Sequence, residues 1–445
     1  MRRLTGAERD ILERLMQARG ERSAVAGGAA GKPADRASRL DFAALSGFVE
    51  QKMLLDAAQK LGLSDPYFLV HEGRAGAETT IDGRALTNFS SYDYLGLNGH
   101  PAVQAAAKSA IDRYGVSASA SRLVAGERPV HRELEAALAE HFGQESCLTF
   151  VSGHAANVAT IGALAGPRDL VVHDALAHNS IVLGAQLSRA ERRSFPHNDM
   201  AALETLLAGL RGQFNRALIV AEGLYSMDGD VCDLPALAEI KERHQAWLMI
   251  DDAHGLGALG ARGRGVFEHF DLDPRRVDIW MGTLSKTLAA CGGCIAGPAA
   301  LVEFLKRSAG GFVYSVAMPP AIAAAALAAL QVMRREPERV ARLRANSRRF
   351  VEAARAAGLD VGASVGAAIV PIVTGSSLRA VTVSQRLRAR GVNVQPIIAP
   401  AVPERLARLR FFLTSEHTTE QIDAAVAATA EEYAALGGRA NARQG

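Results

Sequence analysis

Cysteine is scarce in this chain, with four residues among 445. So few thiols in a chain of this length exclude the disulfide framework of a small secreted domain. Cys291 and Cys294 form a C-x-x-C pair, but the pair lies inside a glycine-rich run. We therefore expect both to be small core residues rather than a redox pair, and we predict no metal site.

Excess charge and long apolar runs are also lacking. The net charge is only +3, so nucleic acid is not expected as a main partner. No apolar segment typical of a signal peptide opens the sequence. The alanine-rich run over residues 321–333 is shorter than the roughly 20 apolar residues that span a bilayer. The expectation is a cytoplasmic protein without a stable membrane span.

The length permits two or three packed units. The N-terminal extension, residues 1–40, combines an amphipathic helix pattern over its first half with an Ala/Gly-rich linker. It is either a flexible tail or a helix that docks a carrier protein. Beyond it we expect an N-terminal segment over residues 41–95, a large domain over 96–320 and a small C-terminal domain over 321–445.

Three apolar strands, expected at residues 217–221, 247–250 and 277–281, repeat at intervals of roughly 30 residues, the size of a β-α-β unit. Such continuous apolar runs are typical of parallel strands buried on both faces, which predicts an α/β fold with a mostly parallel sheet. Ligands bind at the carboxyl ends of such strands. We therefore expect the polar segments that follow the strands to converge on one edge: Glu222 to Gly229, Asp251 to Gly255 and Thr283 to Lys286.

Lys286 is the residue around which these segments are organised. Thr283 and Ser285 precede it, and Gly292 and Gly293 follow it. A lysine amine condenses with an aldehyde when burial makes its neutral form accessible. Hydroxyl groups can hold a phosphate, and glycines let the backbone approach a flat ring. These are the requirements of pyridoxal phosphate (PLP), which we predict as the cofactor.

Other residues at the same edge have tasks around a PLP ring. A carboxylate at the pyridine nitrogen keeps that nitrogen protonated. Asp251 or Asp252 can supply it, and Asp251, the first to follow the strand, is preferred. His254 and Ser226 are candidates to hydrogen-bond the ring oxygen, and His178 is a candidate to stack on the ring.

A phosphate site is expected where Ser152 and Gly153 open a helix after an apolar strand at residues 147–151. A helix N-terminus presents free backbone N–H groups and the positive end of the helix dipole.

The C-terminal part predicts a small α/β domain on one sheet, with strands at residues 368–373, 392–395 and 409–413. Arg410 lies inside the last of these strands. A buried arginine needs a partner, and bidentate binding of a carboxylate suits its planar fork. A structural ion pair and the binding of a substrate carboxylate therefore both remain open.

Together these motifs resemble the α-oxoamine synthases, a family of fold type I PLP enzymes that includes 8-amino-7-oxononanoate synthase and serine palmitoyltransferase. The resemblance covers residues 88–436. It implies the PLP-dependent aminotransferase-like fold, a homodimer, and active sites at the dimer interface. It rests on Ser91-Tyr92-Asp93-Tyr94-Leu95-Gly96-Leu97, Ser152-Gly153-His154-Ala155-Ala156-Asn157, Glu222-Gly223-Leu224-Tyr225-Ser226-Met227-Asp228-Gly229-Asp230, Asp251-Asp252-Ala253-His254-Gly255, Thr283-Leu284-Ser285-Lys286 and Arg408-Leu409-Arg410.

The resemblance also implies roles at matching positions. Lys286 is then the Schiff-base lysine and the base that removes the Cα proton of the amino acid, His178 stacks on the ring, and Asp251 pairs with the pyridine nitrogen. The remaining cofactor contacts are implied for Ser152, Gly153, His154, Ser226, His254, Thr283 and Ser315. On the substrate side, Arg410 matches the arginine that binds the amino acid carboxylate, and further candidates are Tyr92, Asp93 and Thr414.

The chain departs from the family at three places, the first of which is Tyr92, where many members have Asn. Val316-Ala317 replaces hydroxyl residues that in relatives reach the phosphate of the partner subunit, which leaves that contact to Ser315. His154 stands where relatives often carry an aromatic residue.

The implied reaction is a decarboxylative condensation of a small amino acid with an acyl thioester, giving an α-aminoketone, CO₂ and a free thiol. Serine or alanine is favoured, because Tyr92 is similar to the residue in serine palmitoyltransferases, and glycine stays open. The donor is an acyl-CoA or an acyl carrier protein. The alternatives are another fold type I PLP enzyme, such as an aminotransferase or lyase, or an inactive partner subunit. Lys286 and His178 argue against an inactive subunit.

Overall fold

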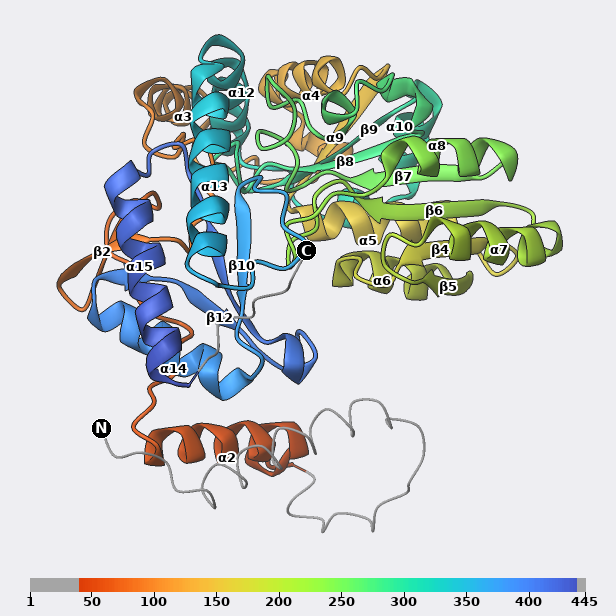
Figure 1. The fold of residues 1–445 in the computed structure, drawn as a ribbon. Coiled ribbons are helices and arrows are strands. Elements are labelled where there is room, and N and C mark those ends of the chain that lie inside the picture. Colours follow the sequence, from red (N-terminus) through yellow and green to blue (C-terminus); the bar gives the residue numbers. More distant parts are fainter. Residues whose placement is uncertain (1–39, 438–445) are drawn as a thin grey trace.

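The computed structural model describes residues 40–437, so the helix expected within the first 20 residues lies outside the described part. Its centre is a seven-stranded sheet in the order β3-β9-β8-β7-β6-β4-β5 (Figure 1). The strands β8, β7, β6, β4 and β5 are parallel, and β9 is antiparallel to both of its neighbours. The predicted, mostly parallel sheet is confirmed. The strands are β3 (Ser146–Phe150), β4 (Leu170–Asp174), β5 (Glu191–Phe195), β6 (Ala217–Glu222), β7 (Trp247–Asp251), β8 (Ile279–Thr283) and β9 (Gly293–Gly297).

Successive residues of the central strands pack into opposite layers of helices (Figure 1). Ile219 and Ala221 belong to one core, with residues of α7 (Met200–Leu210) and α8 (Leu234–Arg243). Leu218 and Val220 belong to the other, with residues of α5 (Gly153–Leu164) and α6 (Asn179–Ser188). Burial on both faces explains why these strands are continuous apolar runs. Further helices are α3 (Pro101–Tyr114), α4 (Pro129–His141), α9 (Val266–His269), α10 (Ala299–Ser308) and α11 (Gly310–Val313). The next helix, α12 (Pro320–Arg335), packs against α3 and α4.

The C-terminal unit contains an antiparallel sheet in the order β10-β13-β12, accompanied by three helices. Its elements are β10 (Ile369–Val373), β12 (Gln395–Ile397), β13 (Arg408–Phe412), α13 (Glu338–Ala356), α14 (Ser377–Ala389) and α15 (Thr419–Ala435).

The expectation of a single C-terminal sheet is wrong. The strand expected at residues 392–395 divides, and its first part, β11 (Val392–Asn393), leaves that sheet. It pairs in parallel with β2 (Arg84–Asn88), which forms a hairpin with β1 (Glu78–Ile81). The N–H groups of Thr87 and Phe89 donate to the carbonyls of Gly391 and Asn393, at 2.8 Å each. Backbone groups at the open edge of the hairpin gain hydrogen-bond partners in this way. A local sequence pattern does not specify this pairing.

The N-terminal part begins with a 3₁₀ turn, Phe42–Ala44, and the helix α2 (Ser46–Lys60), which lies to one side of the body and has no buried residue (Figure 1). No helix within residues 40–437 is long and apolar enough to cross a membrane. In the C-x-x-C pair, Cys294 is buried as expected. Cys291 is exposed, because it lies in the surface loop that precedes β9, so for this residue the expectation of a core position is wrong.

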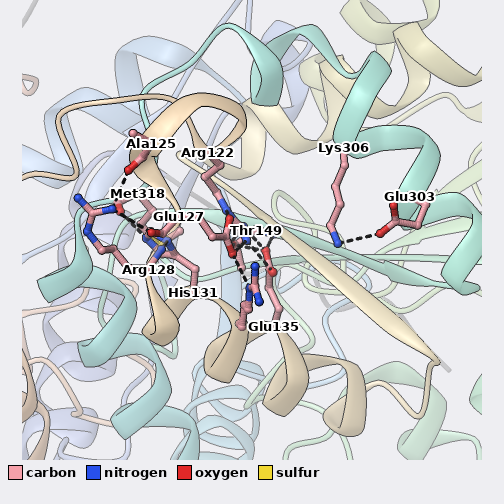
Figure 2. A network of polar contacts seen from close by, with 11 residues as sticks. Arg122, Ala125, Glu127, Arg128, His131, Glu135, Thr149, Glu303, Lys306 and Met318 are labelled. Carbon is pink, nitrogen blue, oxygen red and sulfur yellow. Dashed lines mark hydrogen bonds and ion pairs between the residues drawn. The ribbon is translucent and has the colours of Figure 1, made fainter.

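A buried arginine ties the loop before α4 to the sheet (Figure 2). Arg122 begins the helical turn Arg122–Gly126 and donates to Glu127 at 2.6 and 2.8 Å. It also forms an ion pair with Glu135 of α4. Glu135 in turn accepts hydrogen bonds from the N–H and the hydroxyl of Thr149 in β3, at 2.8 and 2.9 Å. Because β3 leads directly into Ser152, this network helps to place one wall of the site described below.

Replacement of Arg122 with Gln is expected to destabilise the protein by about 3–5 kcal/mol, because it leaves the buried Glu135 carboxylate without its cation. Urea unfolding measures the change. The matched control is Arg132→Gln, since Arg132 is 78% exposed and pairs with Glu127 at 3.2 Å. That exposed pair should contribute at most about 1 kcal/mol. Equal effects of the two substitutions would contradict the structural role of Arg122.

Candidate active site

A cavity of about 400 Å³ opens at the carboxyl ends of β6, β7 and β8. A larger hollow of about 610 Å³ lies beside Arg122, but its charged side chains are paired with one another. Most of the predicted site residues line the smaller cavity: Tyr92, Ser152, Gly153, His154, His178, Ser226, Asp251, His254, Thr283, Lys286 and Arg410. The expected convergence on one edge of the sheet is confirmed.

The structure separates Asp251, which ends β7, from Asp252, which follows it. Asp251 faces the cavity, where its Oδ2 accepts a hydrogen bond from Asn157 Nδ2 at 2.7 Å. Asp252 is fully buried elsewhere, and its Oδ2 accepts from the N–H of Val266 at 2.9 Å. Three glycines make room for this second carboxyl, since an added Cβ would lie about 2 Å from its oxygens at Gly223, Gly255 and Gly265. Asp251 is therefore the carboxylate available to a ligand.

Lys286 lies in the cavity with its amine 6.0 Å from the centre of the Tyr92 ring. Burial lowers the pKa of its amine to about 8, against the opposing charges of Asp251 and Glu222, and Arg410 lowers it further. About a tenth of the amine is therefore neutral at pH 7. This is the form that attacks a carbonyl or accepts a proton.

An anion cradle lies beside the lysine. Ser152 is the N-cap of α5, and its hydroxyl accepts a hydrogen bond from the N–H of Ala155 at 3.0 Å. Gly153 permits close approach, because an added Cβ would lie 2.9 Å from Met281 and 3.1 Å from the hydroxyl of Thr283. The hydroxyls of Thr283 and Ser285 are 2.8 Å apart and both line the cavity. A helix N-terminus flanked by hydroxyls is suited to a phosphate.

His178 is connected to Asp251 through two polar residues that the sequence analysis did not single out. Its Nδ1 lies 2.7 Å from the hydroxyl of Ser180, which accepts a hydrogen bond from Asn157 at 2.9 Å. Asn157 then reaches Asp251. Burial lowers the pKa of His178, so its ring is neutral at pH 7. The signal for Asn157 was its position one helical turn after Gly153, on the same face of α5.

His254 is also held as a neutral ring. Its Nδ1 lies 2.7 Å from the hydroxyl of Tyr94, and both residues are buried. Burial, together with the positive charges of Lys286 and Arg410, lowers the pKa of His254 well below its usual range. The role of Tyr94 was not anticipated, since the two residues are 160 positions apart.

The two arginines of β13 have different partners. Arg408 is buried and pairs with Asp228 at 2.6 Å. Arg410 lines the cavity, where its guanidinium donates to the carbonyl of Ser226 at 3.0 Å and lies over the ring of Phe412. Within residues 40–437, Arg410 forms no ion pair, and its buried Nε has no partner. The structural ion pair therefore belongs to Arg408, and the charge of Arg410 has no carboxylate partner among the described residues.

Three predicted residues do not line the cavity. Asp93 instead caps a turn, where its Oδ1 accepts from the N–H of Leu97 at 2.8 Å, and burial raises its pKa to about 6. The N–H of Thr414 is bonded to His417, and its hydroxyl accepts from the N–H of Glu416 at 3.4 Å. Ser315 lies outside the cavity, and its hydroxyl donates to the carbonyl of Val316 at 3.2 Å.

Glu222 is a cavity residue to which the sequence analysis gave no role. It ends β6 in register with Asp251, it is 3% exposed, and its Oε1 has no partner among the described residues. Burial and the neighbouring Asp251 raise its pKa well above the usual range. Its position as the last residue of a buried strand, like that of Asp251, was the available signal.

These features fit PLP. A partly neutral lysine, a buried aspartate, a helix N-terminus with hydroxyl groups and two neutral imidazoles line one cavity. Two polar atoms of the cavity wall, Asn157 Oδ1 and Glu222 Oε1, are buried without partners in the described chain. A polar ligand in the cavity is consistent with both.

The chain is similar to known enzymes over most of its length. Residues 84–428 match the class I and II aminotransferase family. An 8-amino-7-oxononanoate synthase of Methylococcus capsulatus is 44% identical over 360 residues, covering 81% of this chain and 92% of the relative.

Solved structures of similar chains are named for the same kinds of enzyme. A serine palmitoyltransferase structure with PLP has a TM-score of 0.85 at 29% identity, covering 90% of this chain and all of the other. An 8-amino-7-oxononanoate synthase from Francisella tularensis has a TM-score of 0.69 at 27% identity, covering 79% of this chain and 98% of the other. The chain therefore belongs to the class I and II aminotransferase family and, within it, to the α-oxoamine synthases, PLP-dependent acyltransferases that condense a small amino acid with an acyl thioester and release CO₂.

Proposed function

We propose that this enzyme condenses alanine with the thioester of a seven-carbon dicarboxylic acid. The support is the 44% identity to an enzyme named for the product 8-amino-7-oxononanoate. In that product, carbons 8 and 9 with their amino group correspond to alanine without its carboxyl group. Carbons 1 to 7 correspond to an acyl group that carries a second carboxylate. The donor is an acyl-CoA or an acyl carrier protein.

The observation that carries the proposal is the placement of Lys286, Asp251 and the uncommitted Arg410 around one cavity. When bound, PLP supplies an electron sink for negative charge at the amino acid Cα. Asp251 would hold the ring nitrogen, and His178 would lie against the ring. Ser226 and His254 would bond the ring oxygen. The phosphate would be held by Ser152, Gly153, His154 and Thr283.

The protein's own groups then perform the remaining tasks. Arg410 binds and orients the amino acid carboxylate by a charge-assisted, bidentate contact. Lys286 takes the Cα proton as a neutral amine, which its burial makes accessible. The Cα carbon forms a bond to the thioester carbonyl, the thiol leaves, and the resulting β-keto acid loses CO₂. Tyr92, whose side chain is 40% exposed, stands on the substrate side of the cavity.

A homodimer is part of the proposal. Apolar side chains remain exposed on the turn Arg122–Gly126 and just after α11: Leu123 (62%), Val124 (80%), Tyr314 (90%) and Val316 (51%). Exposed apolar patches of this kind mark interaction sites. Ser315 lies between two of these residues, which would place it in the interface and near the partner's phosphate. The division into domains over residues 96–320 and 321–445, and a cytoplasmic location, are retained as predictions.

Thiol release tests the proposed reaction. The PLP-loaded protein is mixed with the coenzyme A thioester of the seven-carbon diacid or with palmitoyl-CoA, and glycine, alanine and serine are added one at a time. We expect release with alanine and the diacid thioester. Release with serine and palmitoyl-CoA would instead assign the serine palmitoyltransferase reaction. No release with either thioester, together with formation of a keto acid from the amino acid, would assign a transaminase and refute the proposal.

Substitution of Arg410 with Gln should raise the KM for the amino acid about 10- to 100-fold, because a charge-assisted hydrogen bond contributes about 1.5–3 kcal/mol. Binding of PLP should be unchanged. Arg408→Gln is the matched control, two residues away on the same strand. It should lower the thermal unfolding midpoint by removing the partner of Asp228, without a selective effect on the KM. A KM unchanged in the Arg410 variant would remove this residue from the substrate site.

PLP should bind covalently to Lys286 at a rate that depends on pH, because the pKa of the Lys286 amine is lowered. Since the neutral amine reacts, the rate at which the visible cofactor band appears in cofactor-free protein should rise about tenfold per pH unit below pH 8. It should level off above pH 8, the pKa of Lys286 being about 8. Stopped-flow absorbance measures this profile. Lys286→Ala should show no such band, and a band that persists unchanged would refute the assignment of the lysine.

A further inference from the structure

Tyr94 and His254 form a buried pair at the wall of the cavity. Tyr94 is fully buried, and His254 is 7% exposed and lines the cavity. The Tyr94 hydroxyl lies 2.7 Å from His254 Nδ1, and this is the hydrogen bond that the hydroxyl makes within residues 40–437. His254 Nε2 has no hydrogen-bond partner in the described chain, so this nitrogen is available to a ligand in the cavity.

The pairing determines which ring nitrogen of His254 carries the proton. The ring is buried, and Lys286, Arg410 and His178 oppose its positive form, so one nitrogen is protonated and the other is not. If Nδ1 carried the proton, it would donate to Tyr94, and the buried O–H of Tyr94 would have no acceptor. A buried donor without an acceptor is costly. With Tyr94 as donor to Nδ1, both groups are satisfied, and Nε2 carries the proton.

We propose that Tyr94 is a positioning residue that fixes His254 as the Nε2–H tautomer, so that His254 always presents a hydrogen-bond donor to an anionic oxygen of the bound cofactor. The inference rests on the proposed function, in which His254 bonds the ring oxygen of PLP. A histidine free to exchange tautomers would present an acceptor lone pair to that oxygen for part of the time, and two acceptors do not bond.

Local structure holds Tyr94 in place for this task. Asp93 accepts hydrogen bonds from the N–H groups of Leu97 and Asn98, which closes the turn that contains Tyr94. The carbonyl of Tyr94 accepts from the N–H of Ser415 at 2.8 Å. Asp93, predicted as a substrate residue, thus acts at a distance from the cavity, through the turn that carries the tyrosine.

Nitrogen-15 NMR of the histidine rings tests the tautomer directly. The full-length chain is labelled at histidine and measured with PLP and after removal of PLP, and His254→Asn assigns the signal. We expect Nδ1 to be unprotonated and Nε2 protonated in both samples. Tyr94→Phe, which removes only the hydroxyl, should convert this signal to a mixture of tautomers. A wild-type ring protonated at Nδ1, or an unchanged signal in Tyr94→Phe, would overturn the proposal.

The visible band of bound PLP supplies a second readout. Loss of the fixed donor leaves the ring oxygen more basic, so the pH midpoint of the band should rise by about one unit in Tyr94→Phe. Tyr225→Phe is the matched control, because the Tyr225 hydroxyl is also buried but has no hydrogen-bond partner in residues 40–437. It should leave both readouts unchanged. An equal shift in the two variants would show that the loss of any buried tyrosine hydroxyl has this effect, and it would refute the proposal.

The two readouts also separate this inference from the proposed function. If the chain shows no PLP band at all, the proposed function fails, while the tautomer in the cofactor-free chain still decides the pairing of Tyr94 with His254. If the band forms and its midpoint does not move in Tyr94→Phe, the positioning role fails and the proposed function stands.

Discussion

The removal of Lys286 from water is the constraint on which the rest of the site depends. A buried ammonium is costly, and that cost lowers the pKa of Lys286 to about 8. The charge of Asp251 acts in the opposite direction and keeps the group from being permanently neutral. An amine that can exist in both forms near neutral pH can attack a carbonyl, release it and carry a proton between these steps.

Burial favours the neutral form of an ionisable group, so it raises the pKa of an acid and lowers the pKa of a base. This determines the charge of the other side chains in the cavity. Burial raises the pKa of Glu222 and lowers those of His178 and His254. The histidines are therefore neutral rings, suited to packing and directed hydrogen bonding rather than to holding a cation. Charge is concentrated in a few groups with defined partners, and Asp251, bonded to Asn157, lies beside the lysine it influences.

Much of the fold and of the site could be predicted from the sequence, because both follow from local patterns. Continuous apolar runs mark strands buried on both faces, and parallel strands bring the residues that follow them to one edge. This logic brought Lys286, Asp251 and Ser226 to one edge, where they line one cavity, and it preferred Asp251, which lines that cavity, to Asp252, which does not. Glu222 received no role of its own, although it follows the strand expected at residues 217–221 just as Asp251 follows the one at 247–250, because a PLP ring needs only one carboxylate at its nitrogen.

What the sequence did not reveal depends on contacts between distant segments. Arg408 and Arg410 are two residues apart on one strand, and their side chains face the same side of the sheet, so no local pattern distinguishes them. Their partners come from the loop after β6, which reaches β13 only in the folded protein: Asp228 neutralises Arg408, while Ser226 offers Arg410 a carbonyl and no charge. The ion pair with Asp228 thus distinguishes the two arginines. Arg408 stabilises the fold, and Arg410 retains its charge for a substrate. The ion pair of Arg408 joins the loop after β6 to β13 and so contributes to the stability of the fold, whereas Arg410 brings an uncompensated charge to the cavity.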